Sequence, residues 1–189
     1  MSTAQAERTL EVLAKHIIVC TKCPLHESRI NAVPGDGKSS ARVMLIGEAP
    51  GRQEDEQGHP FVGAAGKFLD QVLEGTKLDR KDLFITNTVK CRPPKNRAPK
   101  GPEIEICTSD YLFNQIEAID PKLIMLLGGI ALKAVLGLKT VTEARGKVIK
   151  KDGRKYIVAY HPAAGFYNRG LSEKIKEDFD LLRREIQKL

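Results

Sequence analysis

The stretch RVMLIGEAPG at residues 42–51 is a continuous apolar run that ends in a tight Pro-Gly turn. An apolar run of this length without alternation is typical of a strand buried on both faces. Further strands are expected where similar runs recur, at residues 83–87, 122–127, 146–151 and 155–160. Apolar residues at helical spacing lie between and around these strands, at residues 4–19, 64–75, 103–119, 129–137 and 171–188. This alternation predicts an α/β fold with a parallel sheet between helix layers, and loops at residues 31–40 and 161–170.

The composition is that of a soluble globular protein. With 189 residues, 41% of them hydrophobic and 29% charged, the chain is expected to form one domain over residues 1–189. No apolar stretch approaches the length of a membrane span, and the first eight residues lack the basic start of a signal peptide. We therefore expect a cytoplasmic protein with no membrane partner.

Positive charge is concentrated in two segments. The net charge is +7, and residues 89–100 and 145–155 each carry +5, so the rest of the chain is mildly acidic. Clusters of this kind are typical of proteins that bind a polyanion, since each phosphate contact releases counterions. Solvated lysine-rich loops are an equally weighted alternative.

Four cysteines form two pairs far apart in the sequence, Cys20 with Cys23 and Cys91 with Cys107. In a reducing compartment such pairs are more often metal ligands than disulfides. Zinc sites usually use two short knuckles, whereas the second pair here is 16 positions apart. That separation slightly favours an iron–sulfur cluster over zinc, and buried thiols without a metal are the third possibility.

Polar residues follow three of the expected strands: Glu48 the first, Asn87 the second and His161 the last. Ligands of open α/β sheets bind at the carboxyl ends of the strands, so these side chains are expected to meet there. Four acids between residues 48 and 56 would repel phosphate, and are better suited to holding a water or a developing positive charge. Phe61, in a glycine-flanked turn, is a candidate for stacking on a planar ligand, with core packing as the alternative. For Glu54 and Asp55 the alternative is a solvated acidic turn.

Three motifs in order, GEAPGRQEDEQGHPFVG (47–63), ITNTVKCRPP (85–94) and HPA (161–163), resemble the family 4 uracil-DNA glycosylases. These form the iron–sulfur-containing branch of the uracil-DNA glycosylase superfamily. The resemblance implies a three-layer α/β/α sandwich with a central four-stranded parallel sheet. It also implies a monomeric, monofunctional DNA repair enzyme that flips uracil out of single- or double-stranded DNA and hydrolyses its N-glycosidic bond.

The resemblance also implies roles for the base-binding residues. Phe61 would stack on the uracil ring, and the Asn87 amide would donate to O4 and accept from N3–H. Cytosine presents the opposite pattern, so it would leave buried polar groups unpaired. His161 would donate to O2 while negative charge develops on the departing base.

Three further positions follow from the same resemblance. Glu48 would orient the attacking water and stabilise the oxocarbenium-like sugar. Ala49 occupies the place where other branches carry an aspartate, so no carboxylate can act at that position. Glu54 would crowd the C5 face of the base and exclude the methyl group of thymine.

The remaining expectations concern the metal and the DNA backbone. By resemblance the four cysteines hold a structural [4Fe–4S] cluster, which orders the loop so that Arg92, Lys95, Arg97 and Lys100 meet DNA. The chain departs from the family after residue 163, where a leucine-rich wedge is expected. Phe166 or Tyr167 could fill the gap left by the flipped base, and Arg169 could bind a phosphate.

Three alternatives compete with this interpretation. A non-catalytic, metal-stabilised nucleic-acid-binding module would account for the cysteines and the basic segments, but not for the polar residues after separate strands. A relative that traps DNA covalently needs a histidine between Asn87 and Cys107, and this chain has none there. A glycosylase with a broader range would also remove hypoxanthine or xanthine.

Overall fold

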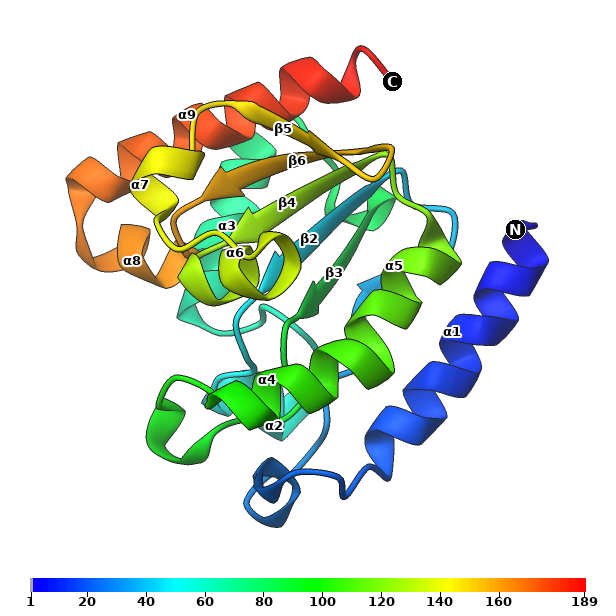
Figure 1. Ribbon diagram of the computed structural model, residues 1–189. Helices are drawn as coiled ribbons and strands as arrows, with labels where there is room; N and C mark the ends of the chain where they lie inside the picture. Colours follow the sequence, from blue (N-terminus) through cyan, green and yellow to red (C-terminus); the bar gives the residue numbers. More distant parts are fainter. Residues whose placement is uncertain (1) are drawn as a thin grey trace.

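The computed structural model describes residues 2–189, apart from the side chain of Tyr167. The strands in that range form one six-stranded sheet in the order β1-β3-β2-β4-β6-β5 (Figure 1). Their bounds are β1 (Asp36–Gly37), β2 (Val43–Gly47), β3 (Leu83–Asn87), β4 (Leu123–Leu127), β5 (Val148–Lys151) and β6 (Arg154–Ala159). The central four are mutually parallel, and β1 and β5 pair antiparallel at the two edges. The four-stranded parallel sheet is therefore confirmed, with an antiparallel strand added at each edge.

The helices are α1 (Thr3–Ile18), α2 (Arg52–Gln57), α3 (Ala64–Gly75), α4 (Gly101–Cys107), α5 (Phe113–Ile119), α6 (Gly129–Leu136), α7 (Val141–Ala144), α8 (Pro162–Tyr167) and α9 (Arg169–Ile186). A π-helical turn at Thr108–Leu112 joins α4 to α5, so the helix expected over residues 103–119 is a single rod with an irregular middle. None of the helices in the described part of the chain is long and apolar enough to cross a membrane.

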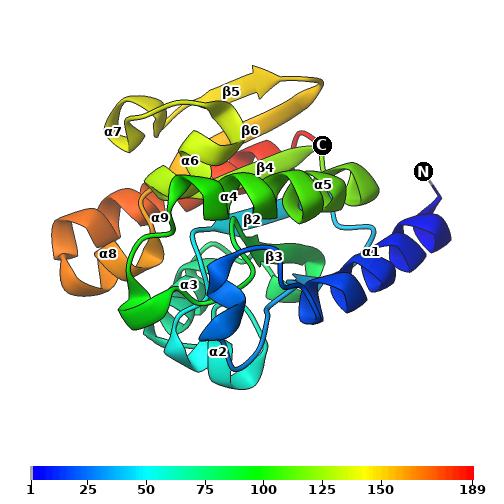
Figure 2. The same cartoon turned by 60° about the horizontal axis from the view of Figure 1, so that its bottom comes forward.

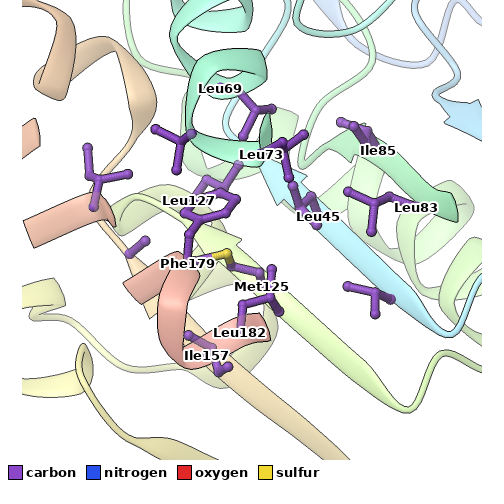
Figure 3. Close-up of a cluster of buried hydrophobic side chains, with 14 of the residues drawn as sticks. Leu45, Leu69, Leu73, Leu83, Ile85, Met125, Leu127, Ile157, Phe179 and Leu182 are labelled. Atoms are coloured by element: carbon purple, nitrogen blue, oxygen red, sulfur yellow. The ribbon is translucent and has the colours of Figure 1, made fainter. Parts of the chain in front are cut away.

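Two apolar cores lie on opposite faces of the sheet. Alternate residues of β2 point to opposite sides, so Leu45 contributes to one core while Met44 and Ile46 contribute to the other. The first core packs against α3 and α9, as Figure 3 shows for Leu73 and Phe179. The second packs against α5, α6 and part of α1, which lies alongside α5 (Figure 1). The three-layer arrangement is confirmed.

Two predicted loops contain regular structure. The loop over 31–40 holds β1, in which Asp36 pairs with Ile85, and the loop over 161–170 holds α8 and the start of α9. The predicted hairpin between β5 and β6 is confirmed, with Asp152 and Gly153 both at positive φ. A two-residue strand has no side-chain periodicity to detect, which is why β1 was missed.

The parallel strands end together at one edge of the sheet. The chain runs from β2 to β3 on one side and then crosses to β4 on the other, so β2 lies at a topological switch point. Helices α2, α4 and α8 lie near this edge, beyond the arrowheads of the strands (Figure 1), and α4 lies in front of the sheet in Figure 2. The segments that follow the strands therefore surround a common space.

Candidate active site

A pocket of about 420 Å³ opens at the carboxyl edge of the sheet. All six residues predicted for catalysis and base recognition line it: Glu48, Ala49, Glu54, Phe61, Asn87 and His161. They come from the segments after β2, β3 and β6, which are far apart in the sequence. The fold therefore brings the predicted pocket residues together, and adds walls from Ala65, Pro93, Asn96 and Ala163.

Asn87 ends β3 and is 2% exposed. Within the described residues its side-chain oxygen, Oδ1, is buried without a hydrogen-bond partner. Gly47 makes this arrangement possible, because a Cβ there would lie 2.4 Å from Asn87 Oδ1 and 2.6 Å from Phe61 Cζ. A buried amide oxygen without a partner is rare, and in a pocket it is free to accept a hydrogen bond from a bound molecule or a water.

The buried Lys90 side chain holds the end of β3 in place. Its Nζ donates to Thr86 Oγ1 at 2.7 Å, to the Asn87 carbonyl at 2.8 Å and to Gln115 Oε1 at 2.7 Å. The side chain is fully buried, and burial lowers its pKa to about 8. Counting Lys90 in a basic surface segment was therefore wrong, since its ammonium group is used inside the protein.

Phe61 has an unusual backbone for a bulky residue, with φ of +53°. Its ring is 5% exposed and stacks on His161, with centroids 5.8 Å apart and planes inclined by 27°. It belongs to the core cluster, so core packing is confirmed; it also lines the pocket, where stacking on a ligand stays a prediction.

His161 caps the amino end of α8. Its Nδ1 accepts a hydrogen bond from the Ala163 N–H at 3.2 Å, which leaves the proton of the neutral ring on Nε2. Burial lowers the pKa of His161 to about 4, so the imidazole is neutral at physiological pH. The ring is thus a neutral donor held in one tautomer.

The two pocket glutamates differ in their surroundings. Glu54 accepts from three backbone N–H groups: Val62 and Gly63 at Oε1, 2.9 and 2.7 Å away, and Gly51 at Oε2, 3.1 Å away. No residue in the range 2–189 donates a hydrogen bond to the Glu48 carboxylate, and burial raises its pKa. The Glu48 carboxylate therefore has lone pairs free to accept hydrogen bonds, whereas the Glu54 carboxylate holds the backbone of the pocket wall in place at Gly51, Val62 and Gly63.

Asp55, next to Glu54, is 1% exposed. Its Oδ1 accepts from the backbone N–H groups of Ile30 and Asn31, at 2.9 and 3.2 Å. The solvated acidic turn considered for this segment is wrong, because both carboxylates are structural acceptors.

The first basic segment is only partly free. Arg97 lines the pocket but makes two hydrogen bonds to Glu103, at 2.7 and 2.9 Å, and this pairing lowers the pKa of Glu103. Arg92 donates through Nε to Asn96 Oδ1 at 2.7 Å. Lys95 is exposed with φ of +54°. Among the described residues, the charges predicted for DNA contact that have no acidic partner are those of Arg92, Lys95 and Lys100. Arg92 and Lys95 adjoin the pocket-lining residues Pro93 and Asn96 in the sequence.

The second basic segment is largely neutralised. Arg145 pairs with Glu177 and Asp178, Arg154 with Glu117 and Asp120, and Lys155 with Glu185. The exposed lysines that remain, 147, 150 and 151, lie at or beside the edge strand β5, where lysine discourages pairing with other sheets. The solvated alternative describes this segment better than a polyanion site.

In the segment after His161, Phe166 lies on α8 and is 54% exposed. Arg169 is exposed at the start of α9. Asn168 caps α9 by accepting from the Gly170 and Leu171 N–H groups. The side chain of Tyr167, the other predicted wedge, lies outside the described residues.

The four cysteines line one small cavity, although the two pairs are some 70 residues apart. All four are free thiols. Arg29 Nη1 donates to Cys91 Sγ at 3.0 Å, and the Lys90 N–H donates to Cys107 Sγ at 3.3 Å. Burial raises the pKa of Cys107 to about 12 and also raises those of Cys91 and Cys23. Among residues 2–189, no group of three or more acidic, histidine or cysteine side chains is arranged to hold a single metal ion.

The site also uses residues that sequence reasoning missed. Gly47 carried a detectable signal, since a glycine that ends a buried strand often marks a close approach. Lys90 gave the wrong signal, because its charge suggested exposure. Nothing in the sequence around Arg80 indicated that its side chain binds the turn at Phe61.

The comparisons agree with the geometry. The family model of the uracil DNA glycosylase superfamily matches residues 34–187. A type-4 uracil-DNA glycosylase of Archaeoglobus fulgidus is 44% identical over 180 residues, covering 90% of each chain. One from Thermotoga maritima is 38% identical, covering 96% of this chain and 97% of its own. A type-5 enzyme of Pyrobaculum aerophilum is less similar, 33% identical over 73% of this chain. The chain therefore belongs to the uracil-DNA glycosylase superfamily and, within it, to the type-4 family, as its motifs indicated.

Proposed function

We propose that this protein excises uracil from DNA by hydrolysing the N-glycosidic bond, which leaves an abasic site. The observation that carries the proposal is the unpartnered Oδ1 of Asn87, buried in a pocket that also presents the Phe61 ring and the Nε2 proton of His161. The family membership agrees with it.

Asn87 supplies the recognition. Its Oδ1 accepts from N3–H of uracil and its Nδ2 donates to O4, so the buried oxygen gains the partner it lacks. Cytosine has an acceptor at N3 and a donor at the 4-position, which leaves both amide atoms facing like groups. Leaving buried polar groups unpaired is the strongest means by which a site rejects an analogue.

His161 stabilises the leaving base. The neutral ring, with Nδ1 already accepting from Ala163, directs its Nε2 proton into the pocket toward O2. Hydrogen bonding from a fixed donor becomes stronger as negative charge develops on the base. Because the pKa of His161 is about 4, the ring does this without carrying a charge of its own.

Glu48 is the residue suited to the water and the sugar. Its carboxylate has free lone pairs at the pocket edge, so it can hold the attacking water and offset positive charge on the sugar. Ala49 beside it brings no carboxylate. Glu54, fixed by three backbone N–H groups, is a rigid wall that we assign to the C5 face, where it would meet the methyl of thymine.

The substrate is DNA in which the uracil nucleotide is turned out of the stack, single- or double-stranded. Arg92 and Lys95, beside the pocket mouth, are assigned to phosphates, and Arg97 holds the loop through Glu103. Phe166, Tyr167 and Arg169 are assigned to the strand flanking the flipped base. We further propose that the enzyme acts as a monomer in the cytoplasm.

The donor set around the cysteine cavity suits a [4Fe–4S] cluster. Four thiols line that cavity, and a cluster takes four cysteine ligands, one on each of its separate metal atoms. Arg29 places positive charge beside Cys91, and the Lys90 backbone N–H donates to Cys107, so both would stabilise the thiolates that form when the thiols lose their protons on binding. Bound there, the cluster would link Cys20 and Cys23 to Cys91 and Cys107, and so fix the loop that carries Pro93 and Arg97.

The test is excision of uracil from a labelled oligonucleotide by purified protein, followed by alkaline cleavage at abasic sites. The wild type and Asn114→Ala, an exposed control on α5, should release uracil, whereas Asn87→Ala should bind DNA but release no uracil. Iron content and visible absorbance, lost in Cys→Ser variants, report the cluster independently. No abasic product from folded, iron-loaded wild type would refute the proposal and favour a non-catalytic binding module.

A further inference from the structure

We propose that Arg80, held in place by Asp70, is a positioning residue that fixes the Phe61 turn and thereby aims its ring at the flipped base. The proposal rests on the proposed function, which makes Phe61 the stacking surface. Arg80 does not line the pocket, so it acts through Phe61 and does not touch the base.

The Phe61 backbone needs support. At φ of +53° it occupies the left-handed region, which is unfavourable for a bulky side chain. Such conformations persist when the surrounding structure holds them, and they are common at ligand-binding sites. The conformation has a clear effect here, since it directs the ring of a surface turn inward, where it is 5% exposed and stacks on His161.

Arg80 holds the carbonyl side of this turn. Its Nη2 donates to the Pro60 carbonyl at 2.6 Å and its Nη1 donates to the Phe61 carbonyl at 3.2 Å. Nη1 also donates to Asp70 Oδ1 at 2.7 Å, so the guanidinium is itself fixed to α3. Two successive carbonyls bound by one planar fork leave the peptide between them little freedom to rotate.

The other side of the turn is held by different groups. Glu54 accepts from the next two backbone N–H groups, Val62 and Gly63. Gly66 allows the turn to lie directly on α3, since a Cβ there would be 1.9 Å from the Phe61 carbonyl oxygen. Arg80 thus completes a clamp in which a carboxylate binds the N–H groups and a guanidinium binds the carbonyls.

Because Arg80 is partly exposed, its effect on activity can be distinguished from an effect on global stability. The Arg80 and Asp70 side chains are 31% and 52% exposed, and ion pairs at such sites contribute little to global stability. Replacing Arg80 should therefore cost activity much more than stability. Arg154 is a suitable control, because it is 14% exposed and pairs with Glu117 and Asp120 at the start of β6, away from the pocket-lining segments.

The experiment compares Arg80→Met, Arg80→Lys and Arg154→Met in the full chain. Single-turnover excision at saturating and subsaturating DNA separates kcat from KM, and calorimetry with free uracil measures base binding directly. We expect Arg80→Met to lose about 10- to 100-fold in kcat/KM and to bind uracil more weakly, as for loss of charged hydrogen bonds. Arg80→Lys should recover part of the loss, and Arg154→Met should match wild type even where its Tm is lower.

A double-mutant cycle and hydrogen exchange complete the test. In a Phe61→Ala background Arg80→Met should cost no further activity, and Arg80→Met alone should speed exchange of the Val62 and Gly63 amides. The proposal would be overturned if Arg80→Met lowered the activity of Phe61→Ala as much as it lowers that of wild type. It would also be overturned if Arg80→Met left the exchange rates of the Val62 and Gly63 amides unchanged. If wild type excises no uracil, the proposed function fails, and the exchange comparison with Arg154→Met still decides whether Arg80 holds the turn.

Discussion

Gly47→Ala adds one methyl group at the base of the pocket, and the structure predicts its effect in detail. Gly47 does not have a positive φ, so alanine fits its backbone without strain. The new Cβ would lie 2.4 Å from Asn87 Oδ1 and 2.6 Å from Phe61 Cζ, whereas ordinary contact begins near 3.4 Å. The substitution therefore displaces the two side chains proposed to read and stack the base.

The size of the displacement sets the expected loss. To restore ordinary contact, Asn87 Oδ1 must move by about 1 Å and the Phe61 ring by slightly less. A misplacement of about 1 Å can cost on the order of 100-fold in rate. We therefore expect kcat/KM to fall about 100-fold, or about 2.7 kcal/mol, with a separate stability cost of about 1–3 kcal/mol for overpacking.

The assay is single-turnover excision from a uracil-containing oligonucleotide, with Tm measured on the same preparations. Gly75→Ala is the matched control, because a Cβ there meets nothing within 4 Å and its φ is not positive. It should retain wild-type activity. Folded Gly47→Ala with kcat/KM within about threefold of that control would refute the claim that Asn87 and Phe61 form the base-binding surface.

Three further predictions concern buried ionisable groups. Burial lowers the pKa of His161 from 6.5 to about 4, so the unfolded chain binds a proton in this range that the folded chain does not. Wild type should thus lose stability relative to His161→Gln as the pH falls from 6.5 to 4, and equal slopes would contradict this. Burial raises the pKa of Asp178 from 3.8 to about 6, so its contribution has the opposite sign. Wild type should gain stability relative to Asp178→Asn as the pH falls from 6 to 3.8, measured by urea unfolding. Lys90→Met leaves three buried acceptors without a donor and should lower the free energy of unfolding by about 3 kcal/mol; a loss below about 1 kcal/mol would show that the network is dispensable.

The sheet could be predicted from the sequence because its strands are buried on both faces. Each of β2, β3 and β4 is a run of five buried residues, and no other element has such a run in the part of the chain that the structure describes. The same regularity explains why Glu48, Asn87 and His161 could be expected at one edge. The short elements within the predicted loops depend on contacts that no periodicity reports, so α8 and β1 were missed.

Charge was the least informative feature of the sequence. Lys90 and Arg97 have the same formal charge as Lys95, yet one is buried, one is bound to Glu103 and one is exposed. The acids that pair with residues of the segment 145–155 are Asp120 and side chains of α5 and α9. All of them are remote from that segment in the sequence. Only tertiary structure decides which positive charges are available to a polyanion. The backbone of Phe61 was likewise hidden, since its φ is held by Arg80 and Glu54 across the fold.

The most direct test of the central claim is the rate of uracil excision by Asn87→Asp. This replacement keeps the shape of the side chain and the acceptor Oδ1, but changes the donor that faces O4 of uracil into a negatively charged acceptor. We expect folded protein that still binds DNA and excises uracil at least about 100-fold more slowly than wild type. Excision by Asn87→Asp at the wild-type rate would contradict the assignment of Asn87 as the group that reads the base.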